Sequence, residues 1–429
     1  QIFTKMQKKI FKWSLIALSA MVTMATVASC GDDDKNEKSE FEIAGSFSKG
    51  SGTKADPYVI STAGELAYLA KSTNDGSSKG YAGEFFELSA DIDLDGIDWE
   101  PIGNYDPDEE GQPNMAKVFQ GFFDGKGHTV SNLKYESSSL YVGTGLFGVV
   151  MGQLSNINCN NFNVSVTLAE AQAIGALVGY CSGAIDNCHI TKANVKGNSC
   201  VGGMVGGSNI CTITNCSAKD ITVTLIGDND FSKDLVQANI AQCGGLLVGG
   251  AFGGNVSNCQ SSGTVSANGN EPVAMGGISG CLSVIDHVSD CTTDVKIVST
   301  KGGHAIGGIC GFAGTITNTA KLMEKEGFTC ETYPAEFTNC TAKIDIETPN
   351  ATHVGGLVGT GLLYLGEESA FKLTNCNVNG TITATTPGTI VGRGTSATII
   401  ACTADVKING EKSDTEIGTT TTAYKSAEQ

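Results

Sequence analysis

The chain has 429 residues, with 45 acidic and 27 basic side chains, and its formal net charge is −18 at pH 7. An acidic surface of this kind repels phosphate backbones, so nucleic acid is not an expected partner. A chain of this length forms either one large solenoid or two domains.

The start of the chain has the features of a bacterial targeting segment. Lys8, Lys9 and Lys12 precede an apolar stretch, Trp13–Val27, that is too short to span a membrane. The Val-Ala-Ser sequence before Cys30 resembles the lipobox of bacterial lipoproteins, so Cys30 is expected to be lipidated and to anchor the protein in the outer membrane. An ordinary cleaved signal peptide and an uncleaved anchor are the alternatives.

The residues after Cys30 are charged and low in apolar side chains. Gly31 to Glu40 contains seven acidic or basic residues in ten, which predicts a flexible tether and not a packed element. The run resembles the acidic export signal of some Gram-negative surface lipoproteins, and that resemblance implies exposure at the cell surface. A simple solvated spacer is the alternative.

A helix is predicted shortly after the tether. Thr62 is a suitable N-cap for a helix from Ala63 to about Ser72, and Glu65 stands at the third helical position of a capping box. One face of this helix is apolar, with Leu66, Leu69 and Ala70. Such a helix would cover the first sheet edges of a solenoid, so we expect an N-terminal helical cap.

An acidic cluster follows, consisting of Asp91, Asp93 and Asp95. Its Asp-x-Asp-x-Asp-Gly spacing is the opening of a calcium-binding loop, although Ile102 occupies the twelfth position where such a loop has a bidentate Glu. Strand alternation gives another interpretation, with Ile92 and Leu94 inward and the aspartates facing water. Calcium is therefore a hypothesis for these three residues, and no other cofactor is expected.

One pattern then occurs eight times between Gly145 and Gly410, about every 26 to 36 residues and at longer intervals where a segment is inserted. Each copy opens on a glycine pair around Leu-Val or a similar dipeptide and closes on a cysteine. The closing cysteines are Cys159, Cys188, Cys216, Cys259, Cys291, Cys340, Cys376 and Cys402. A fixed period of this size indicates stacked structural repeats, each contacting its neighbours.

The apolar residues of each copy alternate over about three short runs, as in Ala342-Lys-Ile-Asp-Ile-Glu, which is the periodicity of strands. Three strands per coil, each lying parallel on the next coil, predict an all-β fold: a parallel β-helix, which we expect to be right-handed. Eight coils about 4.8 Å apart would make a rod about 40 Å long.

The conserved features of the repeat have physical interpretations. Glycine suits either a close backbone approach or a positive φ at a corner. The Asn before the cysteine suits a bend, and stacked copies can form a ladder of side-chain amides. The cysteines are interpreted as buried free thiols, with disulfides as the alternative. A zinc site is disfavoured because no Cys-x-x-Cys pair occurs.

Three repeats carry long insertions, at Ile226–Cys243, Thr319–Thr338 and Gly361–Lys372. Insertions in a solenoid form loops on one flank, which is often the binding flank. Their aromatic residues are therefore predicted ligand contacts: Phe231, Phe328, Tyr333, Phe337 and Tyr364. Rings that only fix the loops to the rod are the alternative.

Taken in order, the predicted segments are a signal peptide at 1–29, a lipidated cysteine and acidic tether at 30–49, an N-terminal cap with the first coils at 50–140, repeats at 141–410, and a C-terminal tail or cap at 411–429.

Several stretches together resemble GLUG-motif proteins. They are the Gly-Leu-Val-Gly elements of the repeat and a leader that includes Gly52-Thr-Lys-Ala-Asp-Pro-Tyr-Val-Ile, Trp99-Glu-Pro-Ile-Gly and Phe119-Gln-Gly-Phe-Phe-Asp-Gly. Proteins with this pattern include bacterial adhesin-like surface proteins and the non-catalytic N-terminal region of immunoglobulin-A-specific metalloendopeptidases. The resemblance implies a cell-surface lipoprotein that binds a host protein or a glycan.

The sequence gives little support for catalysis. No His begins a His-Glu-x-x-His motif, which argues against a metallopeptidase. A β-helix can host polysaccharide lyases or hydrolases, but Arg393 is the single arginine, which leaves little to neutralise an acidic sugar. We therefore expect a non-enzyme, with a glycan-processing enzyme and a structural spacer as the alternatives.

Overall fold

A computed structural model describes residues 41–104, 106, 114–137, 143–167, 173–226, 242–269, 273–282, 287–301, 303, 305–314, 335–361, 371–394 and 397–419. The predicted lipidation site Cys30 and the predicted ligand contacts Phe231, Phe328, Tyr333 and Tyr364 lie outside these residues.

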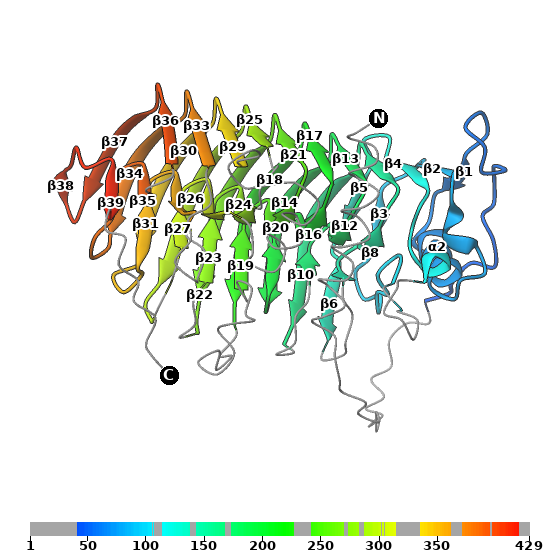
Figure 1. Ribbon diagram of the computed structural model, residues 1–429. Coiled ribbons are helices and arrows are strands. Elements are labelled where there is room, and N and C mark those ends of the chain that lie inside the picture. Colours follow the sequence, from blue (N-terminus) through cyan, green and yellow to red (C-terminus); the bar gives the residue numbers. More distant parts are fainter. Residues whose placement is uncertain are drawn as a thin grey trace, which may run out of the picture.

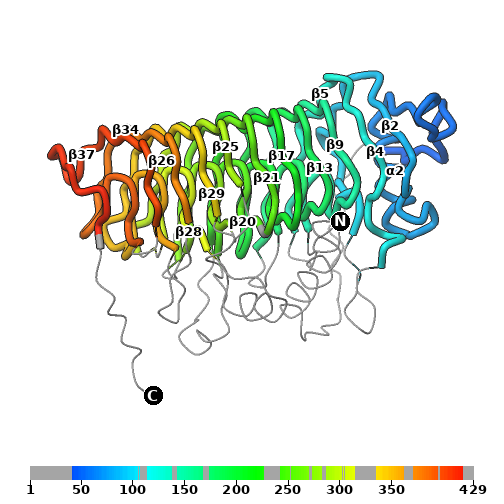
Figure 2. The backbone as a smooth tube through the Cα atoms, turned by 45° about the horizontal axis from the view of Figure 1, so that its top comes forward, coloured from blue at the N-terminus to red at the C-terminus, as the bar shows by residue number. Residues whose placement is uncertain are grey.

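The protein is a rod of stacked coils whose strands form four long sheets, and neighbouring strands of successive coils are parallel (Figures 1 and 2). The predicted parallel β-helix is confirmed. In order along the rod, sheet 1 contains β1 (Tyr58–Ile60), β2 (Phe85–Leu88), β4 (Phe122–Asp124), β9 (Gln153–Ser155), β13 (Ala184–Asp186), β17 (Thr212–Thr214), β21 (Asn255–Ser257), β25 (His287–Ser289), β29 (Ala335–Thr338), β33 (Phe371–Thr374) and β36 (Ala397–Ile400).

Sheet 2 contains the longest strands. They are β3 (Ile92–Asp93), β5 (Thr129–Ser131), β10 (Asn158–Val166), β14 (His189–Gly197), β18 (Ser217–Leu225), β22 (Gln260–Ala267), β26 (Thr292–Ser299), β30 (Thr341–Glu347), β34 (Asn377–Thr383), β37 (Thr403–Ile408) and β38 (Glu411–Lys412), and β6 (Lys134–Ser137) also pairs with β10.

Sheets 3 and 4 hold the glycine-rich elements. Sheet 3 contains β7 (Gly143–Thr144), β11 (Ala173–Gly175), β15 (Cys200–Gly202), β19 (Gln242–Gly245), β23 (Val273–Gly276), β27 (Ala305–Gly307) and β31 (His353–Gly355). Sheet 4 contains β8 (Phe147–Val150), β12 (Val178–Cys181), β16 (Val205–Asn209), β20 (Val248–Phe252), β24 (Ser279–Leu282), β28 (Cys310–Ala313), β32 (Val358–Thr360), β35 (Val391–Arg393) and β39 (Ile417–Thr419).

A complete coil therefore has four strands, and the prediction of three was wrong. The glycine-flanked element is two strands and not one: β11 ends at Gly175 and β12 begins at Val178. Ala176 and Leu177 form the corner between them and are fully buried in the core. The chain turns there because the apolar dipeptide reaches the centre of the rod while the glycines on either side let the two strands lie close together.

The glycines around the corner between sheets 3 and 4 serve a close backbone approach and not a positive φ. A Cβ at Gly206 would lie 2.1 Å from the backbone nitrogen of Ile174, and one at Gly179 would lie 2.1 Å from that of Thr144. Neither glycine has a positive φ. These contacts join a strand of sheet 4 to the sheet 3 strand of the preceding coil, so only glycine fits.

The positive φ is found at the residue before each in-line cysteine. Asn187, Asn215, Asn258, Asn339 and Asn375 have φ between 52° and 57°. Asn tolerates this left-handed conformation better than most residues, which explains its recurrence. Two coils have a different residue at this position, Asp290 (φ 54°) and Ala401 (φ 52°). The first still has a polar side chain, and the second does not.

The predicted amide ladder is present, with interruptions. Asn187 Nδ2 donates to Asn156 Oδ1 at 2.7 Å, and Asn375 Nδ2 donates to Asn339 Oδ1 at 2.8 Å. Carboxylates replace the amide acceptor at three steps, where Asn156 donates to Asp124, Asn215 donates to Asp186, and Asn339 donates to Asp290.

The cysteines stack in line from Cys188 to Cys402, but Cys159 does not belong to this row. Strand pairing places Cys159 opposite Ile190, so the residue equivalent to Cys188 is Ile157. The prediction therefore aligned the first copy of the repeat two residues away from its true position. Twelve of the fourteen cysteines in the described part of the chain are buried, as expected of side chains that pack as small apolar groups.

The predicted cap helix is present as α2 (Ala63–Asn74), at the end of the rod beside β1 and β2 (Figure 1). Thr62 caps it by accepting a hydrogen bond from the Glu65 amide. Leu66, Leu69 and Ala70 are buried, as predicted. The Glu65 carboxylate accepts bonds from the amides of Ser61 and Ser48, so it also ties the preceding chain to the helix.

Two short 3-10 helices follow, η1 (Lys79–Tyr81) and η2 (Met115–Lys117). At the other end of the rod, β38 turns back antiparallel onto β37, and β39 adds a last strand to sheet 4. The start of the 411–429 segment is thus attached to the rod. Within the described residues, Ile400 near the end of the rod is an exposed apolar side chain, with 45% of its surface accessible.

Candidate functional site

One predicted ligand contact is described, and the structure contradicts it. Phe337 lies in β29 with an exposure of 0% and points into the core, in register with Val288 and Leu373 of the adjacent coils. A ligand outside the rod therefore cannot contact this ring. The other predicted rings lie outside the described residues, so the flank loops stay a prediction.

The three aspartates of the calcium hypothesis are exposed, and their carboxylates are directed to neighbouring groups. Asp91 Oδ1 accepts the Thr129 amide at 2.8 Å, which is the main cause of its lowered pKa, and His128 Nδ1 lies 3.2 Å from the same oxygen. Asp93 Oδ1 accepts from Asn132 Nδ2 at 2.9 Å and from the Asp95 amide at 3.0 Å.

These bonds join β3 to the next coil instead of forming a ligand cage. Within the described ranges of the chain, no group of three or more His, Cys, Asp or Glu side chains is arranged to hold a metal ion. The alternation interpretation holds, because Ile92 and Leu94 are buried while the aspartates face water.

A different surface has the features of a ligand site, on the outer face of sheet 1 near the cap. Phe85 of β2 and Phe122 of β4 are paired in register, with ring centroids 4.5 Å apart and ring planes 9° from parallel. Phe122 is 38% exposed and Phe85 is partly exposed. We call these two rings the phenylalanine pair.

The phenylalanine pair follows from the sequence of its strands. Phe85-Phe86 and Phe122-Phe123 are double phenylalanines, and strand geometry sends adjacent side chains to opposite faces. Phe86 and Phe123 fill the core, so their neighbours must lie outside. Sequence reasoning missed this surface, although the two pairs of adjacent phenylalanines were a sufficient signal.

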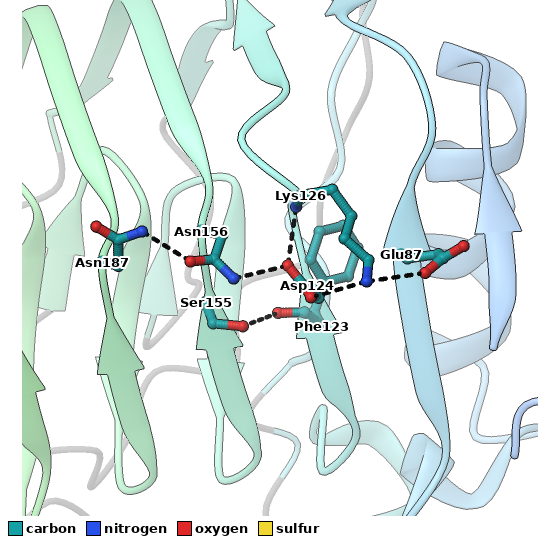
Figure 3. A network of polar contacts seen from close by, with 7 residues as sticks. All are labelled: Glu87, Phe123, Asp124, Lys126, Ser155, Asn156 and Asn187. Carbon is teal, nitrogen blue, oxygen red and sulfur yellow. Dashed lines mark hydrogen bonds and ion pairs between the residues drawn. The ribbon is translucent and has the colours of Figure 1, made fainter. Parts of the chain in front are cut away.

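A polar network lies two residues further along the same face (Figure 3). Lys126 Nζ is 3.3 Å from a carboxylate oxygen of Glu87 and 3.3 Å from one of Asp124. Asp124 Oδ1 also accepts from Asn156 Nδ2 at 2.9 Å, and Asn156 continues into the amide ladder at Asn187. The network therefore connects three coils of sheet 1 and the ladder beside them.

The charges of this network stabilise one another. Hydrogen bonds to Glu87 and Asp124 raise the pKa of Lys126. Burial raises the pKa of Asp124, but hydrogen bonds from Asn156 and Lys126 outweigh it, and the net shift is downward. Asp124 is thus held as a carboxylate, which suits a hydrogen-bond acceptor and is the opposite of what a general acid requires.

Taken together, the surface offers two flat apolar rings beside fixed hydrogen-bonding groups. Such a combination can hold a ring-shaped ligand that has an apolar face and polar edges.

Among the described helices, of which α2 is the longest, none could span a lipid bilayer.

One repeat matches a known sequence family. Residues 240–266, which include β19, β20 and β21, match the GLUG motif. The resemblance inferred from the sequence is confirmed at the level of the motif. The matched stretch contains the glycine-flanked corner between sheets 3 and 4, which we call the GLUG corner.

Two relatives share sequence with parts of the chain. Halomucin from Haloquadratum walsbyi is 29% identical over 186 residues, which are 41% of this chain and 2% of that protein. A glycine-rich protein from Evansella cellulosilytica, provisionally named a membrane protein, is 32% identical over 155 residues, or 34% of this chain and 15% of that protein. The chain thus spans only a small part of each relative.

Among solved structures, the chain is similar to one from Bacteroides ovatus that is described as a candidate immunoglobulin A1 protease. The identity is 22%, the TM-score is 0.44, and the match covers 70% of this chain and 80% of that one.

Proposed function

We propose that this chain is a non-catalytic repeat protein of the bacterial envelope whose rod binds a neutral glycan at the phenylalanine pair. The observation that carries the proposal is the stacked, exposed geometry of Phe85 and Phe122 on a flat sheet face. A pyranose ring has an apolar C–H face that packs on an aromatic ring, and hydroxyl edges that bond to carboxylates and amides.

The surrounding charge narrows the ligand class. The chain carries a formal charge of −18, and Glu87 and Asp124 border the phenylalanine pair. An acidic polysaccharide would be repelled, whereas a neutral one would only need hydrogen-bond acceptors. A host protein stays the alternative ligand, since the flank loops were also predicted to bind.

Attachment to the envelope is supported by the lipobox-like sequence at Cys30 and by the names of the relatives, one a halomucin and one a membrane protein. On this proposal Cys30 carries the lipid, and the charged segment after it holds the rod away from the outer membrane. Calcium coordination by Asp91, Asp93 and Asp95 is not part of the proposal, because their carboxylates serve neighbouring coils.

The test is retention on immobilised polysaccharides, comparing the wild type with Phe122→Ala. Wild-type protein should be retarded by at least one neutral polysaccharide and by no acidic one, and Phe122→Ala should lose the retardation. Ile400→Ala is the matched control, because Ile400 is an exposed apolar residue at the opposite end of the rod and its removal should leave binding unchanged.

Two outcomes would contradict the proposal. Retention that survives Phe122→Ala places the ligand elsewhere on the rod, and the appearance of new reducing ends during incubation shows that the protein is an enzyme. Anchoring is tested separately, since Cys30→Ser should move the protein from the membrane fraction to the soluble fraction.

A further inference from the structure

The thiols of Cys181 and Cys211 are in direct contact, and Cys211 Sγ donates a hydrogen bond to Cys181 Sγ. The two Sγ atoms lie 2.9 Å apart, on consecutive coils and 30 residues apart in the chain. Cys181 is the last residue of β12, and Cys211 directly precedes β17. Both face the core, with exposures of 0% and 3%.

This pair differs from the in-line row of cysteines. In that row Cys259 donates to the backbone carbonyls of Ile213 and Ser257, at 3.7 and 3.2 Å, and its neighbours repeat the arrangement coil after coil. The Cys181 position does not repeat: its partner in the next coil is Ser208. Cys211 is therefore brought to Cys181 by a local feature of its own coil.

That local feature is a strained residue. Ile210 has a φ of 50°, and a β-branched side chain in the left-handed region is an outlier that costs energy unless its surroundings compensate. The peptide group after Cys211 is bonded to both neighbouring coils, because the Thr212 amide donates to the Gly183 carbonyl and the Asn255 amide donates to the Cys211 carbonyl. The strained turn thus holds the Cys211 thiol against Cys181.

We propose that Cys181 and Cys211 form a disulfide that joins two consecutive coils of the rod when the chain folds under oxidising conditions. The sulfurs would need to approach by roughly 0.9 Å to reach bonding distance. Two S–H bonds break and one S–S bond forms, while the two electrons and two protons pass to a second disulfide, such as oxidised glutathione, which becomes two thiols.

Oxidation has to accompany folding. In the finished rod both sulfurs are buried, and burial together with the contact to Cys181 raises the pKa of the Cys211 thiol well above its usual range. A buried thiol in that state hardly forms the thiolate that attacks a disulfide. Cys181 and Cys211 must therefore react with the oxidant during folding, before the next coil packs over them.

The experiment is refolding of the denatured, reduced full-length chain in a glutathione redox buffer, followed by proteolysis without reductant and mass spectrometry. The expected product contains a peptide pair linked through Cys181 and Cys211. The melting temperature of the oxidised protein should exceed that of the reduced protein by something on the order of 5 °C, since the link closes a long loop of the unfolded chain.

Matched variants isolate the pair. Cys211→Ala should lose both the linked peptides and the difference in melting temperature, whereas Cys259→Ala should keep both. The proposal is overturned if the wild type yields no peptides linked through Cys181 and Cys211, or if its main link joins Cys200 to Cys243, which are paired across β15 and β19. Neither result depends on whether the rod binds a glycan.

Discussion

The two kinds of corner in each coil are held by different forces. At the GLUG corner, sheets 3 and 4 approach so closely that backbone atoms touch, and the contact leaves no room for a Cβ at Gly206. At the Asn–Cys corner, the chain turns through a left-handed residue whose side chain bonds to the neighbouring coil.

This difference explains the variation along the rod. The Asn–Cys corner accepts Asp290 and even Ala401, because a lost hydrogen bond costs only about 1 kcal/mol. The glycine that precedes the buried corner dipeptide is kept at Gly175, Gly202, Gly245 and Gly388, because a Cβ there would overlap backbone atoms that have nowhere to move. The GLUG corner therefore depends on steric fit, whereas the Asn–Cys corner tolerates substitution.

The largest effect should come from a methyl group at the GLUG corner. Gly206→Ala should lower the free energy of unfolding by at least about 4 kcal/mol or prevent folding, because its Cβ would meet the backbone of Ile174. The adjacent Gly207→Ala is the control: its Cβ would come no closer than 3.1 Å, to the Ala173 side chain, and should cost less than about 1 kcal/mol. Equal effects in urea unfolding would refute the steric account.

At the cap, we expect the hydrogen bonds of one side chain, Glu65, to contribute to stability as much as packing does. Burial raises the pKa of Glu65, but the bonds from Ser48 and Ser61 outweigh it and lower the pKa from 4.5 to about 2. A group with a depressed folded pKa stabilises the fold above its unfolded pKa, and that stability is lost as the pH falls from 4.5 toward 2.

Glu65→Gln should therefore lower the free energy of unfolding at neutral pH by about 3 kcal/mol and flatten its dependence on pH in that acidic window. Urea unfolding of both proteins at several pH values measures this. A variant whose stability falls with acid as steeply as the wild type's would show that Glu65 is not the titrating group.

A smaller loss is expected at the Asn–Cys corner. Asn339→Ala removes two ladder bonds and places Ala at a φ of 56°, so it should cost about 2 kcal/mol. Asn339→Gly removes the same bonds but tolerates the conformation, so it should cost about half as much. Thermal unfolding of the two variants separates the conformational part from the ladder part, and identical values would mean that φ is unimportant there.

The smallest effect is a gain. Ala401→Asn would put the usual residue at a φ of 52°, next to Asn375, and should raise the free energy of unfolding by about 1 kcal/mol. Ala401→Gly, which supplies the conformational freedom without the amide, is its control. If Asn stabilises no more than Gly does, the ladder does not extend to the last coil.

Much of the fold could be read from the residues themselves. The repeat period and the strand alternation gave the parallel β-helix, and Thr62 with Glu65 marked the start of the cap helix. Both are local patterns that repeat or that lie within one turn of helix. The burial of Phe337 was also legible, since the residue three before each in-line cysteine is apolar throughout, from Ile185 to Ile399.

The site was harder to foresee. Phe85 and Phe122 are 37 residues apart, and their stacking depends on the register between β2 and β4. Asp91 and Asp93 looked like a metal loop because their spacing in the chain resembles one, yet their partners Thr129 and Asn132 come from the next coil. Contacts between coils cannot be predicted from the spacing of residues within one coil.

The sequence by itself determined that identical turns stack in line, because a repeated pattern of apolar, glycine and amide positions has its lowest energy when like positions meet. Only the tertiary structure decided that each coil has four strands, that Ile157 and not Cys159 begins the stacked row, and that Gly206 is needed for space and not for its φ. Those features depend on how closely two coils approach, which packing between sheets sets and no single coil encodes.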